Sequence, residues 1–115
     1  MKKFLLSFTF ALKGLSYAFQ TQLNFKVHTV AAVFAVTMGF YYNISKQEWL
    51  WIILAICMVL ITELLNTALE VLVDFVSPGF HPKAGIIKDV SAGAVLVTAC
   101  LAIFIGLMVF VPRVF

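Results

Sequence analysis

Long apolar stretches are the feature that most limits how this sequence can fold. Residues 48–76 and 89–111 are each long enough to cross a bilayer, which takes about 20 predominantly apolar residues. A third stretch, residues 28–43, is shorter and reaches the interface through aromatic side chains beside it. The chain has 115 residues, of which 63% are hydrophobic and 11% are charged, too apolar for a soluble domain of this size. The sequence therefore predicts an all-α membrane protein.

Residues 1–24 are predicted to form an amphipathic helix at the membrane surface. Apolar side chains such as Phe4 and Phe8 recur on one face at helical spacing, while Lys3 and Lys13 lie among the other positions. A helix that packs against the rest of the protein would show the same pattern, and both interpretations are compatible. Because a lysine interrupts the apolar stretch and no small-residue cleavage site follows, we expect no cleavable signal peptide here.

The basic residues predict how the helices are oriented. Cytoplasmic loops of membrane proteins carry an excess of lysine and arginine. Lys46 and Arg113 fall on one side of the predicted spans, and the other six basic residues fall on the opposite side: Lys2, Lys3, Lys13, Lys26, Lys83 and Lys88. The N-terminus is therefore expected in the cytoplasm and the C-terminus outside. No linker interrupts the chain, so residues 1–115 are predicted to form one domain.

Five polar residues share one face of the second span. They are Glu63, Asn66, Thr67, Glu70 and Asp74. At about 100° per residue, all of them fall within about 60° of Glu63. A charge inside the hydrocarbon costs at least a few kcal/mol, so two acids on such a face indicate proton transfer or metal binding. The alternative is a helix-packing network whose acids are neutralised by lysines.

The segment after the second span brings basic groups to the same end of the helices. Ser77–Lys83 is the connecting loop, and Lys88 and Asp89 are predicted to open the third helix. A lysine beside a helix N-terminus suits an anion, because the free N–H groups and the helix dipole add to its charge. Together with acids for a divalent cation, such a site suits a metal–nucleotide complex. Alternatively, the lysine is only an interfacial anchor.

The remaining reactive residues form no established motif. Cys57 and Cys100 lie in apolar runs and are interpreted as ordinary buried cysteines, with no disulfide or metal site. For His28, a packed or interface-exposed ring is favoured over a catalytic role. The sequence has no Walker loop, glycine-rich fingerprint or nucleophilic triad. Any nucleotide must therefore bind in a site unlike those of the common soluble folds.

Several segments resemble the small prokaryotic diacylglycerol kinase family. Residues 63–74, ELLNTALEVLVD, resemble the family signature, and residues 88–95, KDVSAGAV, resemble its second block. Residues 24–28, NFKVH, and the His81–Pro82 pair are similar to the branch that phosphorylates undecaprenol. The resemblance covers nearly the whole chain.

The resemblance implies a homotrimeric helical bundle in the bacterial plasma membrane, in which each subunit has an interfacial N-terminal helix and three transmembrane helices. Members transfer the γ-phosphoryl group of Mg-ATP to the hydroxyl of a membrane lipid on the cytoplasmic side. Undecaprenol is favoured over diacylglycerol as the acceptor. ATP and Mg²⁺ are thus the implied cofactors and a lipid alcohol the implied substrate, while no nucleic-acid partner is expected.

The resemblance also implies roles for the acids of the second span. Glu63 is the general base that takes the proton of the lipid hydroxyl. Glu70 is a magnesium ligand that also contacts the nucleotide. Asn66 and Asp74 support this site.

Other implied roles fall outside that span, and two positions depart from the family. Lys88 and Asp89 contact the nucleotide phosphates and the metal, and His81 lies in the nucleotide-side loop. Gln22 stands where the best-known members have a second metal-binding glutamate; its amide oxygen can still bind magnesium, but without the charge. Lys3 stands where arginine is common, and lysine cannot hold phosphate in a bidentate manner.

Two other classes of function are weighed against a lipid kinase. One is a catalytically weak or inactive membrane scaffold of the same fold, in which the polar face only joins helices. The other is a conductor of ions or small solutes, which is less favoured because the acids cluster toward one end of the span. Glu63→Gln separates the first two: a kinase loses turnover with its assembly intact, whereas a scaffold changes its association.

Overall fold

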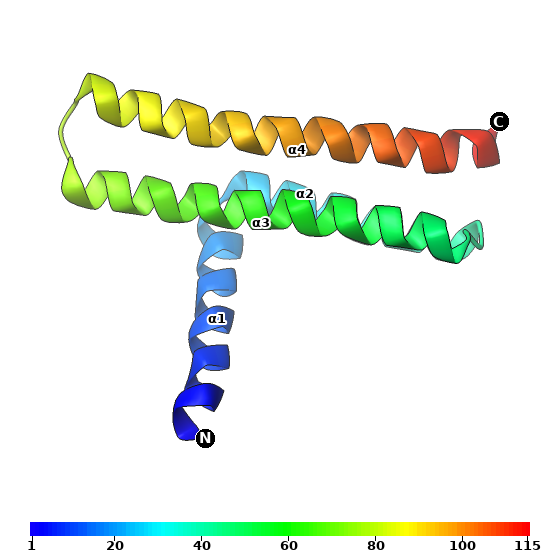
Figure 1. The fold of residues 1–115 in the computed structure, drawn as a ribbon, viewed down its shortest axis with the longest axis horizontal. Helices are drawn as coiled ribbons and strands as arrows, with labels where there is room; N and C mark the ends of the chain where they lie inside the picture. Colours follow the sequence, from blue (N-terminus) through cyan, green and yellow to red (C-terminus); the bar gives the residue numbers. More distant parts are fainter.

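The computed structural model describes residues 1–115 and consists of four helices with no strands. They are α1 (Lys2–Thr21), α2 (Leu23–Tyr41), α3 (Lys46–Val76) and α4 (Pro82–Val114), shown in Figure 1. The last three are each long and apolar enough to cross a membrane. The prediction of an all-α membrane protein, with three spans after an N-terminal helix, is therefore confirmed.

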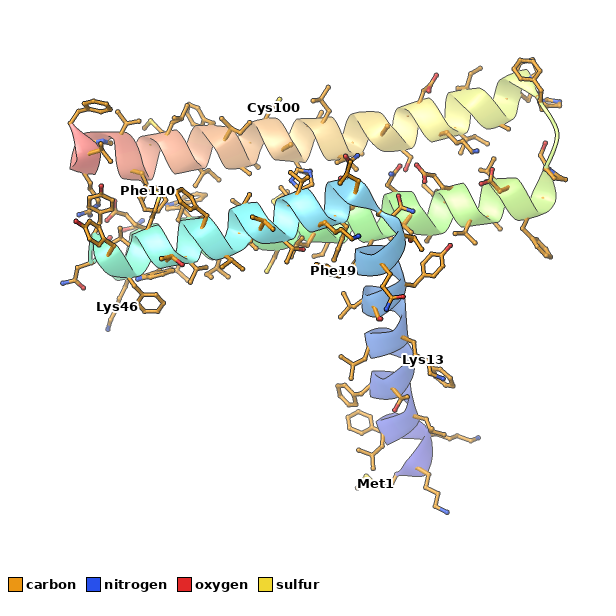
Figure 2. The ribbon with its side chains drawn as sticks, turned by 180° about the vertical axis from the view of Figure 1, so that it is seen from behind. Met1, Lys13, Phe19, Lys46, Cys100 and Phe110 are labelled. Atoms are coloured by element: carbon orange, nitrogen blue, oxygen red, sulfur yellow. The ribbon has the colours of Figure 1, made fainter.

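α3 is the central helix of the bundle. α2 and α4 both pack along it and run antiparallel to it, so that the three lie side by side (Figures 1 and 2). α1 leaves this bundle sideways and runs across the direction of the other helices. A helix with this direction lies along the membrane surface when the others cross the bilayer, which supports the interfacial placement as a proposal.

The α3–α4 hairpin extends past the level at which α1 leaves the bundle. α2 has 19 residues and α3 has 31, and both are joined at the same end by a short turn. At about 1.5 Å per residue, α3 is therefore longer than α2 by about 18 Å. We call the far end, where residues 77–81 join α3 to α4, the hairpin end. Polar residues there stand beyond the plane of α1.

A single residue, Gln22, separates α1 from α2. Its backbone is extended, with φ −111° and ψ 111°, and its N–H donates to the carbonyl of Ala18. α2 then begins at Leu23, five residues before the start of the stretch that the sequence analysis proposed as the first span. The added turn lengthens the helix enough for it to be a candidate membrane span.

α4 begins earlier than the sequence suggested. Pro82 occupies its first turn, where a missing N–H costs nothing, and His81 is the N-cap residue. The Nδ1 atom of His81 accepts a hydrogen bond from the backbone N–H of Lys83 at 3.1 Å. Lys88 and Asp89 consequently lie in the second turn of α4. The prediction that they open the helix is wrong, because these local capping interactions start it at Pro82.

The opposite end of the bundle is tied together by a capping box and an ion pair. The hydroxyl of Ser45 accepts from the N–H of Glu48 at 3.2 Å, and the N–H of Ser45 donates to the Glu48 carboxylate at 3.0 Å. The Arg113 guanidinium, near the end of α4, donates to the same carboxylate. These contacts fix the start of α3 against the end of α4.

Few side chains are buried within one chain, since 17 of the 115 residues fall in this class. The buried apolar cluster lies toward the turn between α2 and α3 and consists of Ile44, Ile52, Ala55, Ile105, Val109 and Phe110. Cys57 and Cys100 are both exposed, and neither forms a disulfide. The interpretation of these cysteines as buried is wrong, because an apolar run in a membrane helix places side chains on its outer faces as well as inside.

Gly39 of α2 is required by a close approach to α3. A Cβ atom at this position would stand 2.6 Å from Cη2 of Trp49. Gly39→Ala is therefore expected to destabilise the fold, because overpacking costs about 1–3 kcal/mol and the better helix propensity of alanine offsets at most about 1. Thermal unfolding in detergent measures this. Gly14→Ala is the control, since its Cβ would have no neighbour within 4 Å; a Gly39→Ala melting temperature at or above the wild-type value would contradict the prediction.

Candidate active site

Glu63 is the most deeply buried acid, on the face of α3 that meets α2. Its side chain is 1% exposed. The Nε2 atom of His28, from α2, lies 3.3 Å from its Oε1 atom. This contact has the distance of an ion pair, but Oε1 takes part in no hydrogen bond of good geometry. The carboxylate therefore faces one basic group and keeps a free acceptor oxygen.

The next turn of α3 adds a second buried acceptor. Asn66 is 7% exposed, and its Nδ2 atom donates to Oε1 of Glu70 at 3.3 Å. Its Oδ1 atom is buried and has no partner. Thr67 is also buried, and its hydroxyl donates to the backbone carbonyl of Glu63 at 2.9 Å. Buried polar atoms are nearly always paired, so two free acceptor oxygens one turn apart suit a ligand that brings a donor or a cation.

Asp74 and Lys88 pair at the hairpin end. Nζ of Lys88 lies 2.5 Å from Oδ1 of Asp74, and the two side chains are 40% and 64% exposed respectively. Exposed ion pairs contribute little free energy, so this contact holds Lys88 only weakly. Asp89 is exposed beside it. Of the acids on this face, Asp74 is therefore paired with a lysine, as the packing alternative expects. Glu63 and Glu70 have no lysine within ion-pair distance.

The N-terminus of α4 is the other polar feature of the hairpin end. His81 uses Nδ1 as the N-cap acceptor, and Lys83 stands in the first turn. The free N–H groups and the helix dipole, which favour an anion, therefore lie beside Lys83 and not beside Lys88. The structure does bring His81 to the same end of the bundle as Lys88, on the loop that joins α3 to α4.

Gln22 is not brought into contact with the acid it was predicted to join. Its amide Nε2 donates to the hydroxyl of Thr21 at 3.4 Å, and the structure records no contact with Glu70. Within one chain, no group of three or more His, Cys, Asp or Glu side chains converges on a point. The structure thus joins Glu70 to Asn66, and leaves Gln22 at the α1–α2 junction.

The oxygen atoms of Glu70 and Asn66 fit a magnesium ion. Mg²⁺ prefers oxygen ligands, and sites that act on nucleotides commonly use one or two carboxylates together with water and substrate phosphates. Glu70 provides one carboxylate, and the free Oδ1 of Asn66 provides a neutral oxygen one turn away. These two residues are therefore the ones that would hold the metal.

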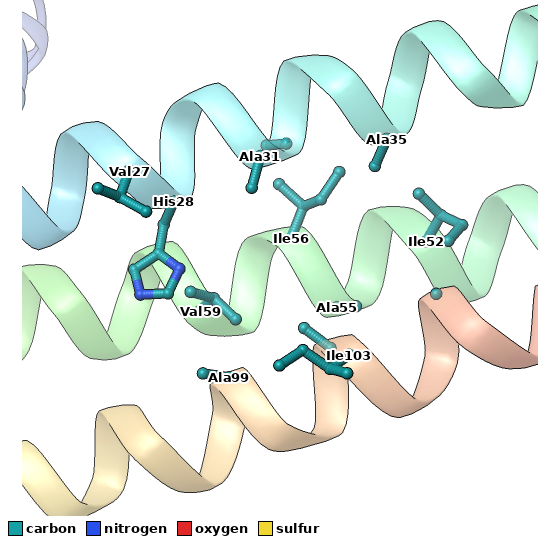
Figure 3. Close-up of a pocket in the computed structure, with 13 residues that line it drawn as sticks. Val27, His28, Ala31, Ala35, Ile52, Ala55, Ile56, Val59, Ala99 and Ile103 are labelled. Atoms are coloured by element: carbon teal, nitrogen blue, oxygen red, sulfur yellow. The ribbon is translucent and has the colours of Figure 1, made fainter.

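His28 is the site residue that the sequence analysis undervalued. Its ring projects from α2 toward α3, as Figure 3 shows. Two cues in the sequence point to this pairing. The short turn between α2 and α3 makes them antiparallel neighbours. His28 lies about 3.6 helical turns before this turn and Glu63 about 4.7 turns after it, which are similar distances.

An apolar groove adjoins the contact between His28 and Glu63. It has a volume of about 340 Å³ and is lined by α2, α3 and α4, with His28 at one end (Figure 3). Most of its lining is small, including Ala31, Ala35, Ala55 and Ala99. The groove follows the direction of the helices, and its mostly short side chains leave the space beside His28 open (Figure 3).

Comparison with known proteins decides the family. A family model described as prokaryotic diacylglycerol kinase matches residues 9–110, which is most of the chain and includes every predicted site residue. The chain belongs to this family. The family consists of lipid kinases of bacterial membranes, so the predictions of a lipid kinase and of the family resemblance are confirmed.

Three relatives illustrate the similarity. The chain is 42% identical over 109 residues to a diacylglycerol kinase of Synechocystis sp., covering 94% of this chain and 62% of that relative. It is 39% identical over 113 residues to an undecaprenol kinase of Bacillus subtilis, covering 98% and 92% respectively. It is 30% identical over 91 residues to a diacylglycerol kinase of Escherichia coli, covering 79% and 75%. The chain therefore matches relatives named for diacylglycerol and a relative named for undecaprenol.

Proposed function

We propose that the protein transfers the γ-phosphoryl group of ATP to the hydroxyl of a membrane lipid alcohol. The observation that carries this proposal is Glu63, an acid 1% exposed whose Oε1 makes no hydrogen bond. A general base must lie within about 2.6–3.2 Å of the proton that it takes. Glu63 lies among apolar helices, so a substrate dissolved in the membrane brings its hydroxyl there and a soluble alcohol does not.

The nucleotide is proposed to bind on the same face of α3, nearer the hairpin end. Glu70 and Asn66 hold Mg²⁺, which neutralises charge on the phosphates when it is bound. Lys88 turns from Asp74 to the phosphates, and Asp89 contacts the nucleotide beside it. His81 and Lys83 border this region at the start of α4. Glu63 lies about 16 Å from Asp74 along the helix, so the base is at the membrane end and the cations are at the water end.

The proposed acceptor is undecaprenol, with diacylglycerol as the alternative. Because His28 both contacts Glu63 and lines the apolar groove, a hydroxyl at Glu63 continues directly into a groove that an apolar tail can occupy. The small side chains along it leave room for the part of an apolar tail nearest the hydroxyl. The undecaprenol kinase of Bacillus subtilis also matches over nearly the whole length of both chains.

We also propose that the hairpin end faces the cytoplasm and that the protein is a homotrimer. The placement of the basic residues supports the orientation, since the lysines of α1 and of the hairpin end lie on one side of the spans. ATP is available on that side. The homotrimer is what the family resemblance implies, and the large exposed apolar surface of one chain is available to other subunits as well as to lipid.

The direct test is transfer of label from γ-labelled ATP by the purified protein in lipid nanodiscs. Undecaprenol, diacylglycerol and a lipid without a hydroxyl are supplied in separate reactions, each with and without Mg²⁺. We expect Mg²⁺-dependent label in undecaprenol. Label in diacylglycerol alone would reassign the acceptor, and label in neither alcohol would reject the proposed activity.

A further inference from the structure

We infer that His28 is a positioning residue that holds Glu63 in place and relays the substrate proton from Glu63 to water. This inference rests on the lipid kinase activity proposed above. It goes beyond that activity, because a buried general base must lose its proton after each turnover.

The burial of the two side chains supports this direction of transfer. Glu63 is 1% exposed, so its carboxylate has almost no direct access to water through which to lose a proton. The side chain of His28 is 24% exposed and stands 3.3 Å from Oε1 of Glu63. His28 lies in the second turn of α2, about 9 Å along the chain from Gln22, the residue that joins α1 to α2. It therefore connects a closed site to the region of the membrane surface.

No other side chain near Glu63 can take the proton in the same way. Thr67 uses its hydroxyl to donate to the backbone of Glu63, and the Asn66 amide donates to Glu70. Lys26, two residues before His28, places its Nζ atom over the Phe19 ring, and Lys88 pairs with Asp74 about three turns from Glu63. His28 is thus the only basic side chain in contact with the carboxylate.

The proton is accounted for at each step. The hydroxyl oxygen of the lipid forms a bond to the γ-phosphorus as the bond from that phosphorus to the β–γ bridging oxygen breaks. The hydroxyl proton passes to the Glu63 carboxylate. It then moves from Oε1 to Nε2 of neutral His28, which carries its other hydrogen on Nδ1 in the tautomer that this step requires. Release of a proton from the imidazolium to water regenerates both groups.

A relay of this kind affects turnover and leaves substrate binding nearly unchanged. If His28 is absent, the proton on Glu63 has to leave through an apolar environment, where charge transfer is slow. His28 is one of the 13 residues that line the groove, so the apolar tail keeps the contacts of the other twelve, and the nucleotide binds elsewhere. A decrease in kcat with a nearly constant KM for the lipid is therefore the pattern that distinguishes a relay from a packing residue.

The test compares His28→Gln and His28→Ala with the wild type in the labelled-ATP assay. Gln keeps a polar contact with Glu63 but carries no proton, so we expect kcat to fall about 10²-fold, at the lower end of general acid–base effects. The lipid KM should change less than about twofold. The solvent deuterium isotope effect on kcat should increase, because proton transfer then limits the rate. Added imidazole should restore turnover of His28→Ala but not of Glu63→Gln.

Thr29→Val is the matched control, because this residue neighbours His28 on α2, is also partly buried, and bonds only to the backbone of Phe25. It should keep wild-type kcat and isotope effect. Wild-type kcat in His28→Gln, or a loss of kcat with an unchanged isotope effect and no rescue by imidazole, would overturn the relay while leaving the kinase intact. A wild-type protein that transfers no label would instead reject the proposed activity itself.

Discussion

Glu63→Gln is expected to lower kcat for lipid phosphorylation by about 10²- to 10⁴-fold, the range that a general base contributes. Glutamine has nearly the same shape as glutamate, so the 1% exposed site keeps its packing. However, its amide cannot accept the hydroxyl proton. The KM for Mg-ATP should stay close to the wild-type value, because the proposed nucleotide contacts lie farther along α3. Initial rates of label transfer, measured together with particle size by chromatography, check both points.

Glu48→Gln is the control for this prediction. Glu48 is another acid of α3, but it lies at the opposite end of the helix, where it pairs with Arg113. Its replacement should leave turnover unchanged even if the fold loses some stability. If Glu63→Gln keeps full activity, Glu63 is not the base. If it changes the association of subunits while no label is transferred by any variant, the protein is a scaffold.

The sequence predicted the spans and the polar face of α3 because both depend on local properties. Apolar length identifies a membrane helix, and the helical repeat alone places Glu63, Asn66 and Glu70 on one face. The structure then joins Asn66 to Glu70, as that spacing allows. These features require no knowledge of how the helices are arranged.

The features that the sequence did not predict depend on a local cap or on a contact between helices. The start of α4 depends on the His81 cap, which moves Lys88 away from the helix N-terminus. The pairing of Lys88 with Asp74 depends on how the hairpin closes. The contact of His28 with Glu63 joins residues 35 positions apart, so no short motif contains it. It follows only from the antiparallel arrangement of α2 and α3.

The second large effect is expected when the proposed magnesium site loses its carboxylate. Glu70→Gln is expected to lower kcat/KM for Mg-ATP by about 10²-fold or more, because a metal ion contributes several kcal/mol to stabilising transition-state charge. The replacement keeps the contact with Asn66 possible but removes the α3 carboxylate proposed to bind the metal. The Mg²⁺ concentration for half-maximal activity should rise. Titration of Mg²⁺ at fixed ATP measures this, and an unchanged titration would reject Glu70 as a ligand.

Gln22→Glu tests the same metal site by adding a carboxylate, whereas Glu70→Gln removes one. If Gln22 contributes to the metal site in the assembled protein, a carboxylate there should lower the Mg²⁺ concentration for half-maximal activity. Gln20→Glu is the control, because it adds the same charge two residues earlier on the exposed surface of α1. A larger shift for Gln22→Glu than for Gln20→Glu indicates direct ligation. Equal shifts would indicate only a general electrostatic effect and would reject Gln22 as a ligand of the metal.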